Sequence, residues 1–381
     1  MIDIYDGALM HFVIAGIVAV LVLALIWEIL RLFFKLKKKL RLRKILVLVR
    51  SPENPIISPD RRKIWELEGT FNPGAILDDN GCVHLFYRAI GNDGLSRIGH
   101  AVSKDGVRFE ERSPYPVFQP MTGYGLPDPK KFKGPMTYDP TFYTSGGGWG
   151  GAEDPRAVRI DGRVYLTYVA FEGWDHVHMA VTSISEKDLD NRRWNWRKPS
   201  LISKERSKNW VLFPEKFHGK FAIIHGIVDK VMIEYVGNLD FVPPINSLPN
   251  RDGAAGYKAE NRKKYWDYYT RGAGAPPVRT EKGWLLFYNV VSHLDPGKYK
   301  IGAMLLDPKD PSIITYRSPE PILSPEMNYE NDGKPGVVYA SGAVIKDGTV
   351  FLYYGAGDRH IGLATIPLSQ LLEWLVKYGK V

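Results

Sequence analysis

In five places along the chain, a turn that contains glycine is followed by a run of alternating apolar and aromatic residues. Alternation with a period of two after such a turn is typical of strands joined in hairpins. A second, weaker pair of strands is expected after each run. The runs cover residues 83–87, 164–168, 221–224, 284–288 and 350–354.

The spacing of the turn glycines predicts how these hairpins are arranged. Glycines at positions 81, 162, 219, 283 and 348 are separated by 81, 57, 64 and 65 residues, and an insertion at 114–151 enlarges the first interval. Two hairpins per repeat make a four-stranded blade, so the pattern predicts an all-β fold, a five-bladed β-propeller over residues 51–381. A β-sandwich is the alternative, but its turns usually recur every ~8–12 residues. The helical spacing of apolar residues at 371, 372, 374 and 375 predicts a short C-terminal helix at 368–378.

The N-terminal segment has a different pattern. Phe12–Trp27 is an unbroken run of sixteen apolar or glycine residues. With the preceding residues it approaches the ~20 residues needed to cross a bilayer. A signal peptide would require a basic start, whereas this chain begins with Asp3 and Asp6. We therefore expect a single transmembrane helix at 1–34 that is retained as an anchor.

Positive charge gathers directly after this apolar run. Residues 31–63 hold twelve Lys or Arg against two acids, although the whole chain carries only 51 − 42 = +9. The positive-inside rule then places the propeller in the cytoplasm. The basic segment at 35–50 is expected to contact anionic lipid head groups. Because the propeller itself is left nearly neutral, the basic isoelectric point does not indicate nucleic-acid binding.

Two observations argue against metal or disulfide chemistry. Cys82 is the one cysteine, which excludes a disulfide framework and cysteine-based metal clusters. His176 and His178 lie two apart, as on one face of a strand, and such a pair is more often structural than metal-binding. We predict no metal and no cofactor, with inorganic phosphate as a possible co-substrate.

The tetrapeptide Glu153-Asp154-Pro155-Arg156 is the strongest candidate for chemistry. It follows the glycine-rich stretch at 146–151. Pro155 restricts the residue before it to extended conformations, which would hold the Asp154 carboxyl at the start of a strand. A proton donor needs such a fixed position. The alternative is a structural corner in which an arginine holds the aspartate.

From about Ser51 onward, the sequence resembles glycoside hydrolase family 130, the β-mannoside phosphorylases and β-mannosidases with a five-bladed propeller. The resemblance implies an enzyme that cleaves β-mannosidic bonds of an oligosaccharide or glycoconjugate and inverts the configuration at the anomeric carbon. It extends over some 85% of the chain. The matching words are 53–59, 72–75, 87–89, 101–106, 153–156, 212–216, 272–277, 283–285, 306–307, 329–330 with Gly333, and 353–358.

The resemblance also implies roles for individual residues. Asp154 would be the general acid, with Glu153 beside it, and in phosphorylases the proton would travel by way of a sugar hydroxyl. Asn72, Arg88 and Asp358 would line the subsite of the cleaved sugar. Arg156 and Glu330 are further substrate-binding candidates.

The departures from the family pattern leave the nucleophile open. Family phosphorylases usually carry an Arg and a His where this chain has Gly226, after His225, and Asn289, after Tyr288. Arg156, Lys208, Lys216 and His225 could partly replace these phosphate ligands. Hydrolysis would instead need a carboxylate base, for which Glu215, Glu330 and Asp267 are candidates. Phosphorolysis, hydrolysis, a transferase variant and a membrane-tethered glycan-binding module without turnover all remain open.

Overall fold

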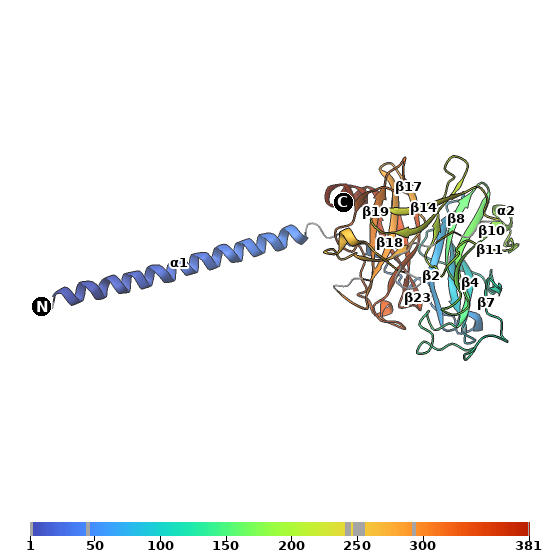
Figure 1. Ribbon diagram of the computed structural model, residues 1–381, viewed down its shortest axis with the longest axis horizontal. Helices are drawn as coiled ribbons and strands as arrows, with labels where there is room; N and C mark the ends of the chain where they lie inside the picture. Colours follow the sequence, from blue (N-terminus) through green and yellow to red (C-terminus); the bar gives the residue numbers. More distant parts are fainter. Residues whose placement is uncertain (1–2, 43–45, 241–244, 247–255, 292–294, 380) are drawn as a thin grey trace. The chain divides into compact units, whose positions relative to one another are not determined.

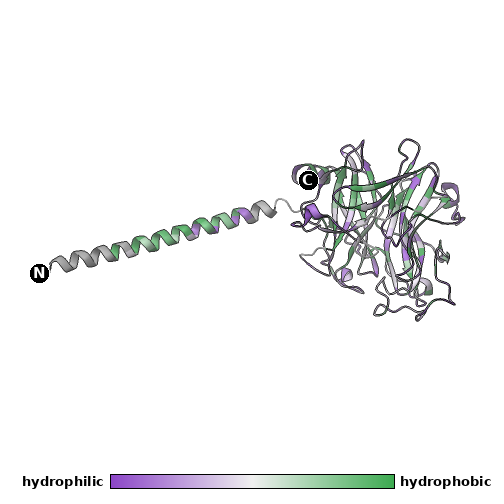
Figure 2. Ribbon diagram, viewed as in Figure 1, coloured by the Kyte–Doolittle hydropathy of each residue, from purple (hydrophilic) through white to green (hydrophobic). Residues whose placement is uncertain are grey.

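The computed structural model describes residues 3–42, 46–240, 245–246, 256–291, 295–379 and 381 (Figure 1). The chain divides into two compact units, residues 1–46 and 47–381. The first unit consists of one continuous helix, α1 (Asp3–Leu42). Residues Gly16–Lys37 of this helix are apolar and long enough to cross a membrane, and none of this stretch is buried (Figure 2). A signal sequence near the N-terminus would have the same features.

The second unit is mostly β-structure, as the sequence predicts, with few helices. Its largest sheet has eight strands, seven of them in the order β11-β10-β9-β8-β4-β3-β2, and β5 pairs with β4. All pairings in it are antiparallel except the short parallel contact between β4 and β8. The strands are β2 (Gly69–Leu77), β3 (Val83–Ile90), β4 (Leu95–Ser103), β5 (Glu111–Arg112), β8 (Gly150–Ile160), β9 (Arg163–Phe171), β10 (Val177–Ser185) and β11 (Ser200–Leu201).

Two further sheets come from the middle of the chain. One has the order β12-β13-β14, and the other has the order β15-β16-β18-β19-β20 with β17 paired to β18. Their strands are β12 (Val211–Leu212), β13 (Phe221–Ile227), β14 (Val231–Val236), β15 (Tyr257–Lys258), β16 (Tyr269–Ala273), β17 (Val278–Thr280), β18 (Gly283–Val291), β19 (Tyr299–Leu306) and β20 (Ile314–Arg317).

The last large sheet joins the two ends of the second unit. Its order is β1-β23-β22-β21, so β1 (Val49–Arg50) pairs with the last strand of the chain. This pairing explains why the unit begins slightly before Ser51. The remaining elements are β6 (Met121–Thr122), β7 (Gly125–Leu126), β21 (Val338–Lys346), β22 (Thr349–Ala356), β23 (His360–Pro367), α2 (Glu186–Asp190), α3 (Leu368–Tyr378), η1 (Ile64–Glu66), η2 (Glu260–Arg262) and η3 (Asn328–Glu330).

The local predictions are confirmed. The five alternating runs form β3, β9, β13, β18 and β22, and each pairs with the strand that follows it. At the turns 161–162, 218–219 and 347–348 both residues have positive φ, as a two-residue hairpin turn requires. The helix α3 occupies 368–378 and buries its apolar face. The pairing of β4 with β8 joins two strand groups in one sheet, so hydrogen bonding gives sheets of eight, six, four, three and two strands and not five four-stranded sheets.

Buried apolar side chains hold neighbouring strand groups together. Phe171 of β9, Trp210 and Ile223 of β13 belong to one continuous buried cluster. A second cluster joins Phe213 to Trp284 of β18, with ring centroids 5.1 Å apart. The interior therefore runs from one sheet to the next, and side chains from several sheets can meet in one pocket.

Candidate functional site

The strands β2, β8, β16 and β21 are among those that carry a bulge, which breaks their regular pairing. The register shifts between residues 71 and 74, 153 and 156, 270 and 272, and 340 and 342. Asn72 and Asp154 lie within two of these bulges with φ of 49° and 51°. The prediction that Pro155 holds Asp154 extended at the start of a strand is therefore wrong, because Asp154 has a left-handed backbone inside β8. Left-handed backbone at residues other than glycine costs about 1–3 kcal/mol and is concentrated at functional sites. The bulges of the first three strands thus bring Asn72, Asp154 and Arg271 to one pocket.

This pocket is small, about 80 Å³, and is lined by segments from most of the second unit. Charged and hydrogen-bonding groups dominate its wall. The lining residues are Asn72, Arg88, Thr144, Ser145, Gly146, Asp154, Trp174, Lys208, Asn209, Arg271, Tyr299, Lys334, Val337, Tyr339 and Asp358.

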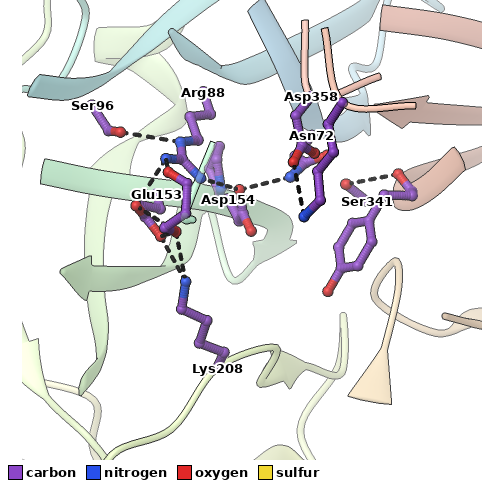
Figure 3. A network of polar contacts seen from close by, with 12 residues as sticks. Asn72, Arg88, Ser96, Glu153, Asp154, Lys208, Ser341 and Asp358 are labelled. Carbon is purple, nitrogen blue, oxygen red and sulfur yellow. Dashed lines mark hydrogen bonds and ion pairs between the residues drawn. The ribbon is translucent and has the colours of Figure 1, made fainter. Parts of the chain in front are cut away.

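Asp154 lies at the centre of the polar network in Figure 3. Its Oδ1 accepts a hydrogen bond from Asn72 Nδ2 at 2.8 Å and lies 3.4 Å from Arg88 Nη1. Burial raises the pKa of the Asp154 carboxyl, but the charges of Arg88, Arg156 and Lys208 lower it by more, and the Asn72 hydrogen bond adds to them. The pKa therefore lies below its ordinary value, and without a ligand the carboxyl is ionised near neutral pH.

Glu153 lies beneath the pocket and is fully buried. Its carboxylate binds Arg88 Nη2 at 2.8 Å and Lys208 Nζ at 2.9 Å, and it accepts hydrogen bonds from Ser145 Oγ (Figure 3). Arg88 also donates to Ser96 Oγ at 3.1 Å. Because Glu153 compensates both cations, it fixes the two side chains that flank Asp154.

Arg156 is buried next to the pocket and is not part of its wall. Its guanidinium donates to the carbonyl oxygens of Asp154 and Gly274, and it lies over the ring of Tyr339. Its Nη2 has no hydrogen-bond partner among the described residues. Arg156 therefore holds the bulge in place and keeps one donor free.

Two cations of the pocket were not singled out by sequence reasoning. Arg271 donates to the hydroxyls of Tyr269 and Tyr299 at 3.3 and 3.2 Å, and in the described part of the chain it forms no ion pair with a carboxylate. Lys334 Nζ lies 3.6 Å from Asp358 Oδ2. Both residues stand beside words of the family resemblance, Gly272 and Gly333, and that proximity is the signal that could have found them.

Several buried polar atoms at the site have no hydrogen-bond partner among the described residues. Asn72 Oδ1 and Asn209 Oδ1 accept no hydrogen bond within the described residues. Gly355 leaves room for the Asn72 side chain, because a Cβ there would lie 2.0 Å from Asn72 Oδ1. Buried polar atoms without partners are costly and usually indicate water or a ligand. Free acceptors and donors close together suit the hydroxyl groups of a sugar.

The structure brings Asn72, Arg88, Asp154 and Asp358 to one pocket, and it places other candidates elsewhere. Glu330 is fully buried and pairs with Arg50 Nε at 2.8 Å and with Tyr354. Asn289 exchanges two hydrogen bonds with the backbone of Ala340, at 3.0 and 2.8 Å, which occupies both ends of its amide. Neither residue lines the pocket.

The remaining candidates also lie outside the pocket wall. His225 is buried against Trp210, and burial lowers its pKa to about 4, so it is neutral at neutral pH. Lys216 pairs with Asp161 at 2.8 Å. Two carboxylates considered as bases are engaged by arginines: Glu215 with Arg279, and Asp267 with Arg262 and Arg317. Among the described residues, no cluster of three or more His, Cys, Asp or Glu has a metal-binding arrangement.

Known proteins with similar sequences share one activity class. A family model described as beta-1,4-mannooligosaccharide phosphorylase, glycoside hydrolase family 130, matches residues 48–377. A 1,2-beta-oligomannan phosphorylase of Thermoanaerobacter sp. is 32% identical over 86% of this chain and 99% of that protein. A beta-1,2-mannobiose phosphorylase of the same organism is 32% identical over 85% of this chain and 98% of its own length.

Solved structures agree on the fold. A putative glycosidase of Bacteroides thetaiotaomicron superimposes with a TM-score of 0.65 and 26% identity, covering 84% of this chain and 96% of that one. Another structure comes from work on family 130, which describes glycoside hydrolases that target beta-1,2 mannosidic linkages in Candida mannan. It superimposes with a TM-score of 0.65 and 25% identity, covering 85% of this chain and 95% of that one.

Proposed function

Since this chain belongs to glycoside hydrolase family 130, we propose that it cleaves β-mannosidic bonds by phosphorolysis, with inversion and with Asp154 as the general acid. The single observation that carries the proposal is the position of Asp154 in a pocket with four cations. Arg88, Lys208, Arg271 and Lys334 line this pocket with the carboxylates of Asp154 and Asp358. The buried carboxylate of Glu153 binds Arg88 and Lys208, which leaves four cations against three carboxylates. An excess of cations suits an anionic nucleophile.

Phosphate fits the pocket better than an activated water. Hydrolysis with inversion requires a second carboxylate about 6.5–9.5 Å from the acid. The candidate bases Glu215, Glu330 and Asp267 are paired with arginines outside the pocket. Asp358, the second carboxylate in the pocket wall, is paired with Lys334 at 3.6 Å. Arg271, by contrast, lines the pocket without a carboxylate partner among the described residues. It can therefore replace part of the phosphate binding that family phosphorylases obtain from an Arg and a His, where this chain has Gly226 and Asn289.

The reaction then balances as follows. A phosphate oxygen forms a bond to the anomeric carbon of the mannosyl unit, and the bond from that carbon to the glycosidic oxygen breaks. The proton of Asp154 reaches the leaving oxygen by way of a sugar hydroxyl. The products are α-mannose 1-phosphate and the shortened sugar. Glu153 acts as a positioning residue through Arg88 and Lys208.

The low pKa of Asp154 makes protonation dependent on the ligand. An ionised Asp154 cannot donate a proton, and nearby cations are the reason that it is ionised. A phosphate that carries about −1.5 to −2 charges would counter these cations. Negative charge beside a carboxyl raises its pKa. Bound phosphate therefore raises the pKa of Asp154, so that the carboxyl can carry the proton it donates, and it also attacks the sugar.

The relatives favour β-1,2 linkages. The two Thermoanaerobacter enzymes named for such linkages are 32% identical over at least 85% of this chain. A beta-1,4-mannooligosaccharide phosphorylase of Ruminococcus albus is 26% identical over 61%. Incubating the protein with β-1,2-mannobiose tests the proposal, with expected release of mannose 1-phosphate only when phosphate is present. Free mannose at the same rate without phosphate would indicate hydrolysis, and binding without any product would indicate a glycan-binding module.

We propose a propeller architecture for the second unit. Five groups of antiparallel strands, β2–β5, β8–β11, β12–β14, β15–β20 and β21–β23 with β1, match the five repeats. The pairing of β1 with β23 closes the last group with the first strand, as in closed propellers.

We also propose that α1 is a retained anchor and that the propeller faces the cytoplasm. The support is the apolar stretch Gly16–Lys37 and the basic residues that follow it. These basic residues would contact anionic lipid head groups.

A further inference from the structure

Lys334 and Asp358 lie close together in the pocket wall, but they belong to two separate turns of the chain. Lys334 is part of the loop 331–336, between η3 and β21, and Asp358 is part of the turn 357–359, between β22 and β23. Lys334 Nζ lies 3.6 Å from Asp358 Oδ2. The distance between the two charges therefore depends on how the loop lies on the turn.

The backbones of the loop and the turn are in direct contact at two glycines. A Cβ on Gly333 would lie 2.5 Å from Gly357 O, and a Cβ on Gly357 would lie 2.1 Å from Asp332 O. Both glycines have positive φ, 95° and 62°. Lys334 N also donates a hydrogen bond to Gly357 O at 2.7 Å. A small shift of the loop against the turn would therefore move Lys334 relative to the pocket.

Asp332 links the loop to the residues that follow the turn. Its Oδ2 lies 2.8 Å from His360 Nε2, and its Oδ1 lies 3.4 Å from Arg359 Nη1. His360 is held from its other side, because its Nδ1 lies 2.9 Å from Ser58 Oγ. The hydrogen bond from His360 lowers the pKa of Asp332, so the carboxylate is ionised at neutral pH. Both carboxylate oxygens of Asp332 thus bind the strand side of the contact.

These bonds are expected to contribute little to the stability of the fold. The Asp332 side chain is 51% exposed, and exposed ion pairs are weakened by water and salt. Asp332 does, however, stand two residues before Lys334. A displacement of about 1 Å in a site can lower activity strongly, so a contact that adds little stability can still matter for function.

We propose that Asp332 is a positioning residue that acts through Lys334. Its bonds to His360 and Arg359 hold the loop 331–336 on the turn and thereby keep the Lys334 ammonium at the pocket wall. The inference rests on the proposed function, because Lys334 is one of the four cations assigned to the phosphate. Asp332 itself does not line the pocket. Its loss should therefore weaken phosphate binding more than sugar binding.

Kinetics of the full-length protein and its variants test the proposal. Asp332→Ala should raise the KM for phosphate about tenfold and change the KM for β-1,2-mannobiose little. Asp332→Asn keeps an oxygen acceptor for His360, so it should restore most of the loss. Asp240→Ala is the matched control, because Asp240 is a similarly exposed carboxylate that pairs with Arg197 outside the pocket. The thermal midpoints of all variants should match that of the wild type.

A double substitution shows whether Asp332 acts through Lys334. Lys334→Met removes the ammonium, so adding Asp332→Ala to this variant should not change the KM for phosphate further. An equal loss in both backgrounds would overturn the inference. So would a KM for phosphate that Asp332→Ala leaves unchanged in the otherwise wild-type protein.

Chemical labelling separates this inference from the proposed function. Asp358 raises the pKa of Lys334, so the Lys334 amine should react slowly with acetic anhydride. Asp332→Ala should increase the rate of acetylation at Lys334, measured by mass spectrometry, whereas Asp240→Ala should not. This result would support the positioning role even if the wild type released no mannose 1-phosphate, which would contradict the proposed function alone. An unchanged rate in Asp332→Ala would show that Asp332 does not position Lys334.

Discussion

Asn72 donates a 2.8 Å hydrogen bond to Asp154, and both residues have left-handed φ at bulges of the neighbouring strands β2 and β8. The bulges turn two side chains out of regular strands and toward each other. Asn72 Nδ2 is engaged in this bond, while Asn72 Oδ1 is buried against Gly355 without a hydrogen-bond partner among the described residues. The Asn72 side chain also lines the pocket, so it can orient the acid and stand beside a bound sugar.

Replacing Asp154 tests the general acid. Asp154→Asn keeps the shape of the side chain but removes the transferable proton, so kcat on β-1,2-mannobiose should fall by about 10²–10⁴. The basic limb of the pH profile should also disappear, because that limb reports loss of the donated proton. Steady-state kinetics from pH 5 to 9 measure both effects.

A substrate with a good leaving group is the control for this change. A dinitrophenyl β-mannoside needs little protonation, so Asp154→Asn should cleave it nearly as fast as the wild type does. Wild-type turnover of the variant on mannobiose would remove Asp154 from the mechanism.

Arg271 is the second test, because it faces the pocket without a carboxylate partner. Arg271→Gln should raise the KM for phosphate about 10- to 100-fold, the value of a lost charge-assisted hydrogen bond of ~1.5–3 kcal/mol. The KM for mannobiose should change little. Phosphate titrations of initial rate measure the effect.

Arg279→Gln is the matched control, since Arg279 is an exposed arginine paired with Glu215 outside the pocket. It should leave the phosphate dependence intact. An unchanged KM for phosphate in Arg271→Gln would place the nucleophile site elsewhere and reopen hydrolysis.

His225 links stability to pH. Burial lowers its pKa to about 4 in the folded protein, against ~6.5 in an unfolded chain. The folded state therefore binds fewer protons, so the contribution of His225 to stability is present above pH 6.5 and is lost as the pH falls from 6.5 to 4. Between pH 7.5 and 5 this loss is about 2 kcal/mol.

Urea unfolding of the second unit, residues 47–381, at these two pH values measures this loss. His225→Gln should lose less stability on acidification than the wild type, although it is less stable at pH 7.5. His176→Gln, at an exposed position, should follow the wild type. Identical acid sensitivity of His225→Gln and the wild type would contradict the assignment.

The sequence was sufficient for local elements and insufficient for the partners of charged residues. Alternation and turn glycines are local signals, so β3, β9, β13, β18, β22 and α3 could be predicted directly. The gathering of Asn72, Arg88, Asp154 and Asp358 followed from the family resemblance.

The partners of Glu330 and Asn289 could not be predicted, because they are distant in sequence. Arg50 lies 280 residues from Glu330, and Ala340 lies 51 residues from Asn289. Each contact depends on how the sheets pack. Arg271 was not predicted as a site residue, because its significance is the lack of a carboxylate partner among the described residues. Only the structure shows that.

The last prediction concerns the N-terminal helix. If Gly16–Lys37 is a retained anchor, the full-length protein should stay in the membrane fraction after alkaline carbonate extraction, at the mass of the complete chain. A variant that begins at Val47 should be soluble and active, because the second unit contains the whole pocket. If the basic residues at the C-terminal end of the apolar stretch keep the second unit in the cytoplasm, protease added to intact cells should leave this unit undigested. Lysed cells are the control for digestion. A mature protein shortened by the helix would show that the segment is a cleaved signal sequence, and digestion in intact cells would reverse the orientation.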